Sequence, residues 1–151
     1  MEAIIFVGIQ GAGKSTFYRE RFFDTHVRIN LDMLRTRKRE NLLLHACFTG
    51  GQRFVVDNTN PDRKSREKYL NGAKTSGFRA VAYYFDTDPD DAIPMNAGRT
   101  GKQRVPEKAI HATQRKLEIP SREEGFHEVY RVWRDECGVI QVEKLEDDPG
   151  S

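Results

Sequence analysis

The chain has little cysteine and no long hydrophobic run. Its two cysteines, Cys47 and Cys137, lie far apart without C-x-x-C spacing. This spacing suggests neither a disulfide framework nor a zinc site and fits a reducing compartment. No apolar stretch approaches the length of a membrane span, and the first expected strand begins by residue 3, which leaves no room for a signal peptide. We therefore expect a cytoplasmic protein with no membrane partner.

Hydrophobic residues are also scarce, at 37% of the 151 residues, and net charge is low, at +2. Charged residues make up 32%, so the composition indicates a small, well-solvated domain. The length favours a single domain over residues 1–146 with a disordered tail at 147–151. Basic residues form three clusters, at residues 35–39, 63–68 and 99–104. Such clusters are commonly solvated helix faces, but their place beside expected phosphate-handling loops favours a basic groove.

A glycine-rich segment, Gly8–Ser15, fits the P-loop pattern G-x-x-x-x-G-K-[ST]. The apolar run 3–7 before it predicts a buried strand, and residues 16–23 after it predict a helix. A strand, a tight turn and a helix N-terminus together form an anion site, because backbone N–H groups point at phosphate oxygens. We expect Lys14 to reach the β- and γ-phosphates of a nucleoside triphosphate and Ser15 to ligate Mg²⁺. The residues expected to bind ATP or another NTP here are Gly11, Ala12, Gly13, Lys14, Ser15 and Thr16.

Strand and helix patterns alternate along the rest of the chain. Further strands are expected at 27–30, 54–56 and 79–85, and a β-hairpin at 126–133 and 139–145. Helices are expected at 33–39, 40–48, from the Asn60-Pro61 pair to Gly77, from about 88, and from Pro106 to about 116. The glycine-bearing, basic segment 95–105 lacks core residues and is interpreted as a lid. This alternation predicts an α/β three-layer sandwich, with a parallel sheet of four or more strands and helices on both faces.

Ligands of such sheets bind at the carboxyl ends of the strands. Asp32 follows the expected second strand, where its carboxylate could accept the proton of an acceptor hydroxyl. The alternative is that Asp32 only caps the next helix. Arg35 is expected one turn further on the same helix face, where it could bind a phosphate of the acceptor. The alternative is a solvated surface arginine.

Two further residues could complete a phosphotransfer site. Asp57 ends an apolar strand in the Walker B manner, so it could help to hold Mg²⁺, directly or through water. That pattern is common and weak by itself. Arg99 lies in the expected lid and could swing onto the γ-phosphate; otherwise it is a mobile surface residue.

The order of these motifs resembles the kinase module of polynucleotide 5′-hydroxyl kinases of phages and animals. The resemblance rests on the P-loop, on the N-x-D-x-x-R stretch 30–35, and on the strand end Asp57-Asn58-Thr59-Asn60-Pro61. Residues 65–69 and the segment 114–126 are similar to the kinase half of animal polynucleotide kinase-phosphatases. The likeness covers most of residues 3–132.

The resemblance implies a role for each matching residue. Asp32 would be the general base that activates a 5′-hydroxyl, Arg35 would hold the phosphate just 3′ of the acceptor nucleoside, and Thr59 would lie in the acceptor groove. Arg99 matches a lid arginine that contacts donor phosphates. The chain has Met95 where phage enzymes have a further basic residue, and Arg104 could compensate.

The sequence therefore predicts a polynucleotide 5′-kinase that acts on DNA or RNA ends in nucleic-acid repair. Because little chain remains for a phosphatase or ligase, we expect a kinase acting alone. A P-loop kinase of a small metabolite or nucleotide-sugar, as in the zeta-type toxins, is the alternative, although a neutral acceptor needs no basic run at 35–39. An NTP-hydrolysing regulatory module would require switch loops, for which there is little room.

Overall fold

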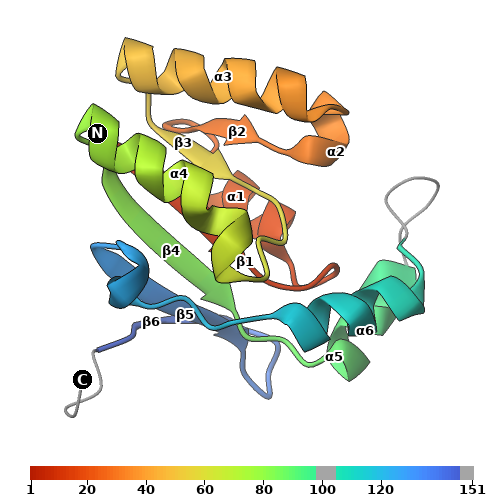
Figure 1. The fold of residues 1–151 in the computed structure, drawn as a ribbon. Coiled ribbons are helices and arrows are strands. Elements are labelled where there is room, and N and C mark those ends of the chain that lie inside the picture. The colour runs from red at the N-terminus through yellow and green to blue at the C-terminus, as the bar shows by residue number, and fades with distance from the viewer. Residues whose placement is uncertain (98–104, 147–151) are drawn as a thin grey trace.

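A mostly parallel sheet forms the centre of the molecule (Figure 1). The computed structural model describes residues 1–97 and 105–146. Its six strands follow the spatial order β2-β3-β1-β4-β5-β6. Neighbours from β2 to β5 pair in parallel, and β6 pairs antiparallel with β5, which confirms both the α/β fold and the C-terminal hairpin. The strands are β1 (Glu2–Val7), β2 (Val27–Ile29), β3 (Phe54–Val56), β4 (Arg79–Phe85), β5 (Glu128–Arg134) and β6 (Ile140–Lys144).

The central strand β1 is buried on both faces, which is why it is apolar almost throughout. Side chains alternate along a strand, so Ile5 faces one core cluster and Ile4 faces the other. Helices α3 (Arg37–Gly50) and α4 (Arg63–Ser76) supply the first cluster, and α1 (Lys14–Arg21) supplies the second. The three layers expected from the alternating pattern are therefore present (Figure 1).

The helices after β2 differ from the expectation of segments 33–39 and 40–48. A short helix α2 (Leu31–Leu34) ends at Arg35, whose φ of 75° leaves the helical region, and α3 begins at Arg37. Asn30 caps α2 and Thr36 caps α3 by accepting hydrogen bonds from backbone N–H groups. Arg35 is thus not on a helix face shared with Asp32, because Thr36 competes for the backbone as an N-cap.

The expected helix start at Asn60-Pro61 is also wrong. Asp62 is the N-cap, and its side chain accepts from the Ser65 N–H. Asn60 instead has a φ of 44°, and its amide donates to the Phe6 carbonyl oxygen at 2.8 Å. A long-range contact to β1 therefore overrides a good local capping pattern.

The expected lid segment 95–105 is described only at its ends. Helix α5 (Pro89–Ala97) continues into it, and α6 (Glu107–Lys116) follows it. Val105 packs, together with the two helices, against a small core around Ile9, Ala92 and Ile110. Both helices lie beside the P-loop in Figure 1. The expected tail 147–151 lies outside the described residues.

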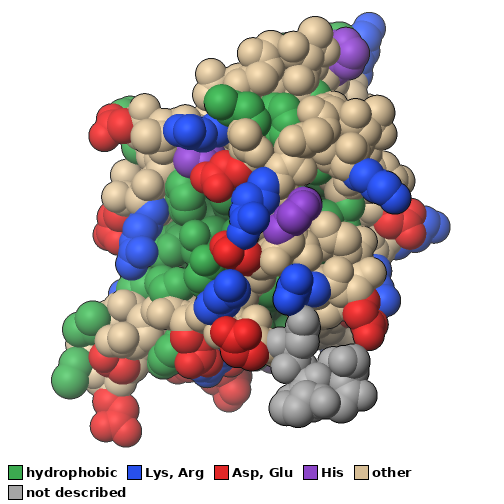
Figure 2. Space-filling model, turned by 90° about the vertical axis from the view of Figure 1, so that its left-hand side faces the viewer, with side chains coloured by type: hydrophobic (Ala, Val, Ile, Leu, Met, Phe, Trp, Pro, Cys, Tyr) green, Lys and Arg blue, Asp and Glu red, His purple; other side chains and the backbone are tan. Residues whose placement is uncertain are grey.

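The side of the molecule where the strands begin carries charges of both signs. Figure 2 shows Lys and Arg interspersed with Asp and Glu there, around an area of hydrophobic side chains. This face is therefore not a continuous basic surface. No helix within residues 1–97 and 105–146 is long and apolar enough to cross a bilayer.

Candidate active site at the carboxyl ends of the strands

The P-loop connects β1 to α1 through two glycines with left-handed backbone conformations. Gly11 has a φ of 82° and Gly13 a φ of 90°, values that L side chains rarely adopt. A Cβ on Gly11 would stand 2.6 Å from the Ala92 carbonyl oxygen, so this glycine also allows α5 to pack against the loop. Lys14 is 8% exposed, and its ammonium donates to the carbonyl oxygens of Gly8 and Ile9 at 3.0 and 2.6 Å. The loop thus holds its lysine inside the turn.

Ser15, Asp57 and Arg28 form a compact polar triangle beside the P-loop. The Ser15 hydroxyl donates to Asp57 Oδ2 at 2.9 Å. Arg28 Nε donates to the same oxygen at 2.8 Å, and Arg28 Nη2 donates to Ser15 Oγ at 3.0 Å. The Asp57 side chain is 2% exposed, so its charge is compensated by a partner rather than by water.

The chemistry of this triangle fits a divalent cation. Mg²⁺ prefers oxygen ligands, takes one or two protein groups and completes its shell with water and substrate phosphates. Ser15 offers a hydroxyl and Asp57 a carboxylate, and their oxygens lie 2.9 Å apart. These two residues are those that the sequence predicted for the metal.

Hydrogen bonds fix helix α2 to the end of β3. Asn30 Nδ2 donates to the Asp57 carbonyl oxygen at 2.6 Å, while Asn30 Oδ1 accepts from the Met33 N–H at 2.9 Å. The Leu31 N–H donates to Asn58 Oδ1 at 2.8 Å. The first turn of α2 is therefore tied at two points to the strand end that carries the candidate metal ligand.

Asp32 and Arg35 project from this anchored element. Both are exposed. Because Asn30 supplies the cap of α2, Asp32 is not needed for that structural role. The Arg35 backbone is held in its positive-φ conformation by an N–H bond to the Leu31 carbonyl oxygen at 2.7 Å. Such strain costs about 1–3 kcal/mol and is typical of ligand clamps and active sites.

Thr59 links the segment after β3 to the P-loop through its backbone. Its carbonyl oxygen accepts from the Gly8 N–H at 2.9 Å, and its side chain is half-buried. The structure thus brings Thr59, the P-loop, Asp57 and Asp32 to one edge of the sheet. Arg99 and Arg104, the two arginines expected in the lid, lie outside the described residues.

A buried carboxylate, Glu40, supports the same edge from α3. It is 0% exposed and pairs with Arg37 at 3.1 Å and with Lys68 at 2.5 Å. It also accepts from the Tyr69 hydroxyl at 2.7 Å and from Asn58 Nδ2 at 3.3 Å. Burial acts to raise the pKa of Glu40, but the hydrogen bonds from Lys68 and Tyr69 and the charge of Lys68 outweigh it, so its pKa lies below the ordinary value.

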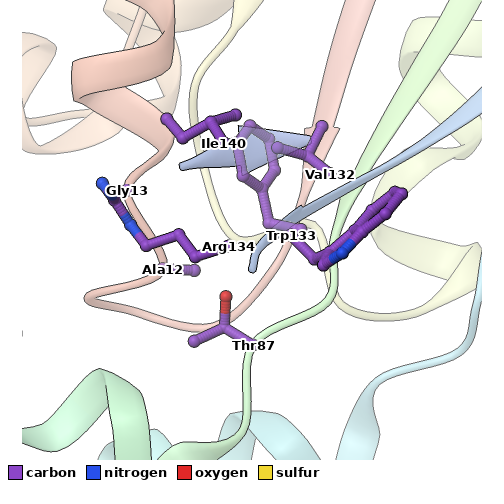
Figure 3. Close-up of a pocket in the computed structure, with 8 residues that line it drawn as sticks. Ala12, Gly13, Thr87, Val132, Trp133, Arg134 and Ile140 are labelled. Atoms are coloured by element: carbon purple, nitrogen blue, oxygen red, sulfur yellow. The ribbon is translucent and has the colours of Figure 1, made fainter. Parts of the chain in front are cut away.

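A shallow pocket lies on the other side of the P-loop, against the C-terminal hairpin. Ala12, Gly13, Thr87 and Arg134 are among its lining residues. Figure 3 shows the Arg134 side chain extending along the P-loop toward Gly13, while Trp133 points away from it. A Cβ on Gly13 would stand 3.8 Å from Arg134 Nη2, so this guanidinium lies next to the N-terminus of α1.

Arg28 and Arg134 were not among the residues predicted for the site. A signal for Arg28 was present, because a charged residue inside the short strand 27–29 must face either solvent or a charged partner. Arg134 gave no such signal, since its place depends on the pairing of β5 with β4. Only the sheet brings it to a P-loop more than a hundred positions away in the sequence.

Known proteins are similar in sequence to this chain over most of its length. The family model described as an AAA domain matches residues 4–120. The protein of Acanthamoeba polyphaga mimivirus named "Putative bifunctional polynucleotide phosphatase/kinase" is 30% identical over 138 residues. The bifunctional polynucleotide phosphatase/kinase of Schizosaccharomyces pombe is 25% identical over 135 residues. Each alignment covers 87% of this chain but 33% of the relative. The chain therefore spans about a third of the length of these two proteins.

A solved structure shows the same fold. A gluconokinase from Sinorhizobium meliloti 1021 superposes with a TM-score of 0.60 at 19% identity, covering 87% of this chain and 82% of the other. At that identity the likeness concerns the fold of a P-loop kinase alone. The matched family model shows that the chain belongs to the AAA domain family, and over 87% of its length the chain is similar to the two polynucleotide phosphatase/kinases.

Proposed function

We propose that this chain transfers the γ-phosphate of ATP or another NTP to the 5′-hydroxyl of a DNA or RNA end. The observation that carries the proposal is the attachment of α2 to the P-loop side of the sheet. Asn30 joins the Asp57 backbone to the first turn of α2, and Asp32 stands in that turn. Donor phosphates on the P-loop and an acceptor hydroxyl at Asp32 would thus be held by one hydrogen-bonded unit.

Each part of the site has a role in the proposed reaction. Lys14 and the backbone N–H groups of residues 11–16 bind the donor phosphates, and Ser15 and Asp57 hold Mg²⁺, which neutralises charge on them. Asp32 takes the proton of the attacking hydroxyl. The Arg134 guanidinium, next to the N-terminus of α1, adds a cation on the donor side. Arg99 and Arg104 remain candidates for the lid.

The acceptor side favours a polyanion. Arg35 stands at the end of α2, and the exposed residues Lys38 and Arg39 follow in the first turn of α3. A nucleic-acid strand presents a phosphate at each nucleotide, so several cations beside the general base would hold the strand that carries the 5′-hydroxyl. Thr59 lies on the same side of the sheet, in the segment that follows β3.

The direct test supplies labelled ATP, Mg²⁺ and a 5′-hydroxyl oligonucleotide, beside a panel of sugars, sugar acids and nucleotide-sugars. We expect label on the oligonucleotide. Asp32→Ala should lower kcat by about 10²–10⁴-fold, the usual contribution of a general base, while the Kd for ATP stays unchanged. Asp24→Ala, at an exposed carboxylate in the turn between α1 and β2, is the matched control.

A small-molecule kinase is the second candidate, and the gluconokinase fold likeness is the observation that favours it. In that case label would appear on a member of the metabolite panel and not on the oligonucleotide. Full activity of Asp32→Ala on the oligonucleotide would instead disprove the assignment of the base.

A further inference from the structure

Arg28 occupies a position that phosphoryl transfer alone does not explain. It is the middle residue of β2, level with Val55 of β3, and its guanidinium reaches both candidate metal ligands. One donor binds the carboxylate of Asp57 at 2.8 Å and another binds the hydroxyl of Ser15 at 3.0 Å. A cation already lies against the two oxygens proposed for Mg²⁺.

Arg28 compensates the charge of Asp57 in the structure as it stands. Asp57 Oδ2 is buried, and within the described residues Arg28 is the basic side chain that forms an ion pair with it. A guanidinium and a divalent ion at the same carboxylate oxygen and the same hydroxyl compete for the same lone pairs, and their positive charges repel at that separation. The Arg28 side chain is 28% exposed, so it has a route toward solvent.

We propose that Arg28 is an internal cation that competes with Mg²⁺ for Ser15 and Asp57 and leaves both when a metal-bound nucleotide binds. The inference rests on the proposed metal site. It implies that Arg28 keeps Ser15 and Asp57 in position before binding and sets how strongly nucleotide affinity depends on the metal. Arg28 is therefore a regulator of metal affinity rather than a catalytic residue.

The experiment compares the Kd for ADP, measured by titration calorimetry, with saturating Mg²⁺ and with EDTA. The Kd in EDTA divided by the Kd in Mg²⁺ measures the coupling between metal and nucleotide. Arg28→Met should increase this ratio by about tenfold, because a charge-assisted competitor is lost. Arg79→Met is the matched control. Arg79 is also a strand residue whose side chain forms an ion pair with a carboxylate, that of Glu128, but it lies at the opposite end of the sheet from the P-loop. Its ratio should equal that of the wild type.

Thermal unfolding gives a readout that does not depend on activity. In EDTA, Arg28→Met should unfold at a lower temperature than the wild type, because Asp57 loses its buried partner. Addition of Mg²⁺ and ADP should raise the unfolding temperature more in Arg28→Met than in the wild type. Arg28→Lys keeps the positive charge but lacks the planar guanidinium that can donate to two oxygens at once. It should show an intermediate coupling ratio, and it replaces Arg28→Met in the test if that variant does not fold.

The outcomes separate the inference from the proposed metal site. An unchanged ratio in Arg28→Met and Arg28→Lys would show that Arg28 does not compete with the metal, and a smaller ratio would show that Arg28 assists metal binding. Either result would overturn the inference. If Mg²⁺ does not alter the Kd for ADP in the wild type, or if Asp57→Asn keeps the full Mg²⁺ effect of the wild type, the metal site itself is wrong, and the inference fails with it.

Discussion

Single residues in this site act through several neighbours at once, and Glu40 is the clearest case. Its carboxylate contacts two cations, a tyrosine hydroxyl and the side-chain amide of Asn58. Asn58 in turn accepts from the Leu31 N–H in α2. Through Asn58, the buried Glu40 of α3 is thereby connected to the turn of α2 that carries Asp32.

We expect Glu40→Gln to lower the free energy of unfolding at pH 7 by about 2 kcal/mol, the usual range for hydrogen bonds to a charged group. Since the folded-state pKa of Glu40 is lowered, its ionised form stabilises the protein above the unfolded-state pKa of about 4.3. That stabilisation disappears as the pH falls through the lower folded-state value. Urea unfolding from pH 7 down to pH 3 should therefore show wild type and variant converging in acid.

Glu67→Gln, on the exposed face of α4, is the control and should change stability by no more than about 0.5 kcal/mol. A constant gap between wild type and Glu40→Gln over the whole pH range would contradict the role of the carboxylate charge.

At the scale of elements, one arginine connects the start of α4 to the segment before β5. Arg66 is 0% exposed and makes two hydrogen bonds to Glu124, both at 2.9 Å. The same guanidinium donates to the carbonyl oxygens of Asn60, Pro61 and Glu118. It thus fixes the turn after Thr59 to the 3₁₀ turn Arg122–Glu124, which lies before β5.

Removing one partner of this buried pair should be costly. We expect Glu124→Gln to lower the free energy of unfolding by about 3 kcal/mol, because Arg66 keeps a buried charge without its carboxylate. The double variant Arg66→Met, Glu124→Leu should recover part of this loss. Chemical denaturation of the three proteins measures both effects, and equal stabilities of wild type and Glu124→Gln would show that the pair is not structural.

At the scale of the molecule, charge is distributed unevenly although its sum is +2. Charges of both signs alternate on the side where the strands begin (Figure 2), whereas the stretch 35–39 is basic at the opposite ends of the strands. A polyanionic acceptor should therefore bind in one orientation, with its phosphates along α2 and the start of α3.

This asymmetry predicts how salt affects the reaction. The KM for a 5′-hydroxyl oligonucleotide should rise steeply with salt concentration. Each contact to a phosphate of a single strand adds about 0.7 to the slope of log KM against log salt concentration. Arg35→Ala should reduce the slope by about one contact. Arg53→Ala, an exposed arginine before β3, is the control. An equal slope in the wild type and Arg35→Ala would remove Arg35 from the acceptor site.

Local patterns in the sequence were sufficient for most elements and for the P-loop. The strand 79–85 and the C-terminal hairpin have the expected type, because their apolar alternation and turn residues act over a few positions. The expected helix starts at 33 and at 60–61 were wrong, because hydrogen bonds to residues far away in the sequence determine the backbone at these positions. Asn60 is held by β1, and Asn30 caps α2 while it binds the end of β3.

The sequence by itself determined the nucleotide site, since a P-loop is built from consecutive residues whose backbone conformations depend on glycine. It also placed Asp32, Asp57 and Thr59 at the carboxyl ends of parallel strands, where they must converge. The tertiary structure alone decided that Arg28 lies on the candidate metal ligands, that Arg134 reaches the P-loop, and that Arg66 anchors α4. These contacts join residues on separate elements, so their geometry depends on strand order and packing rather than on local pattern.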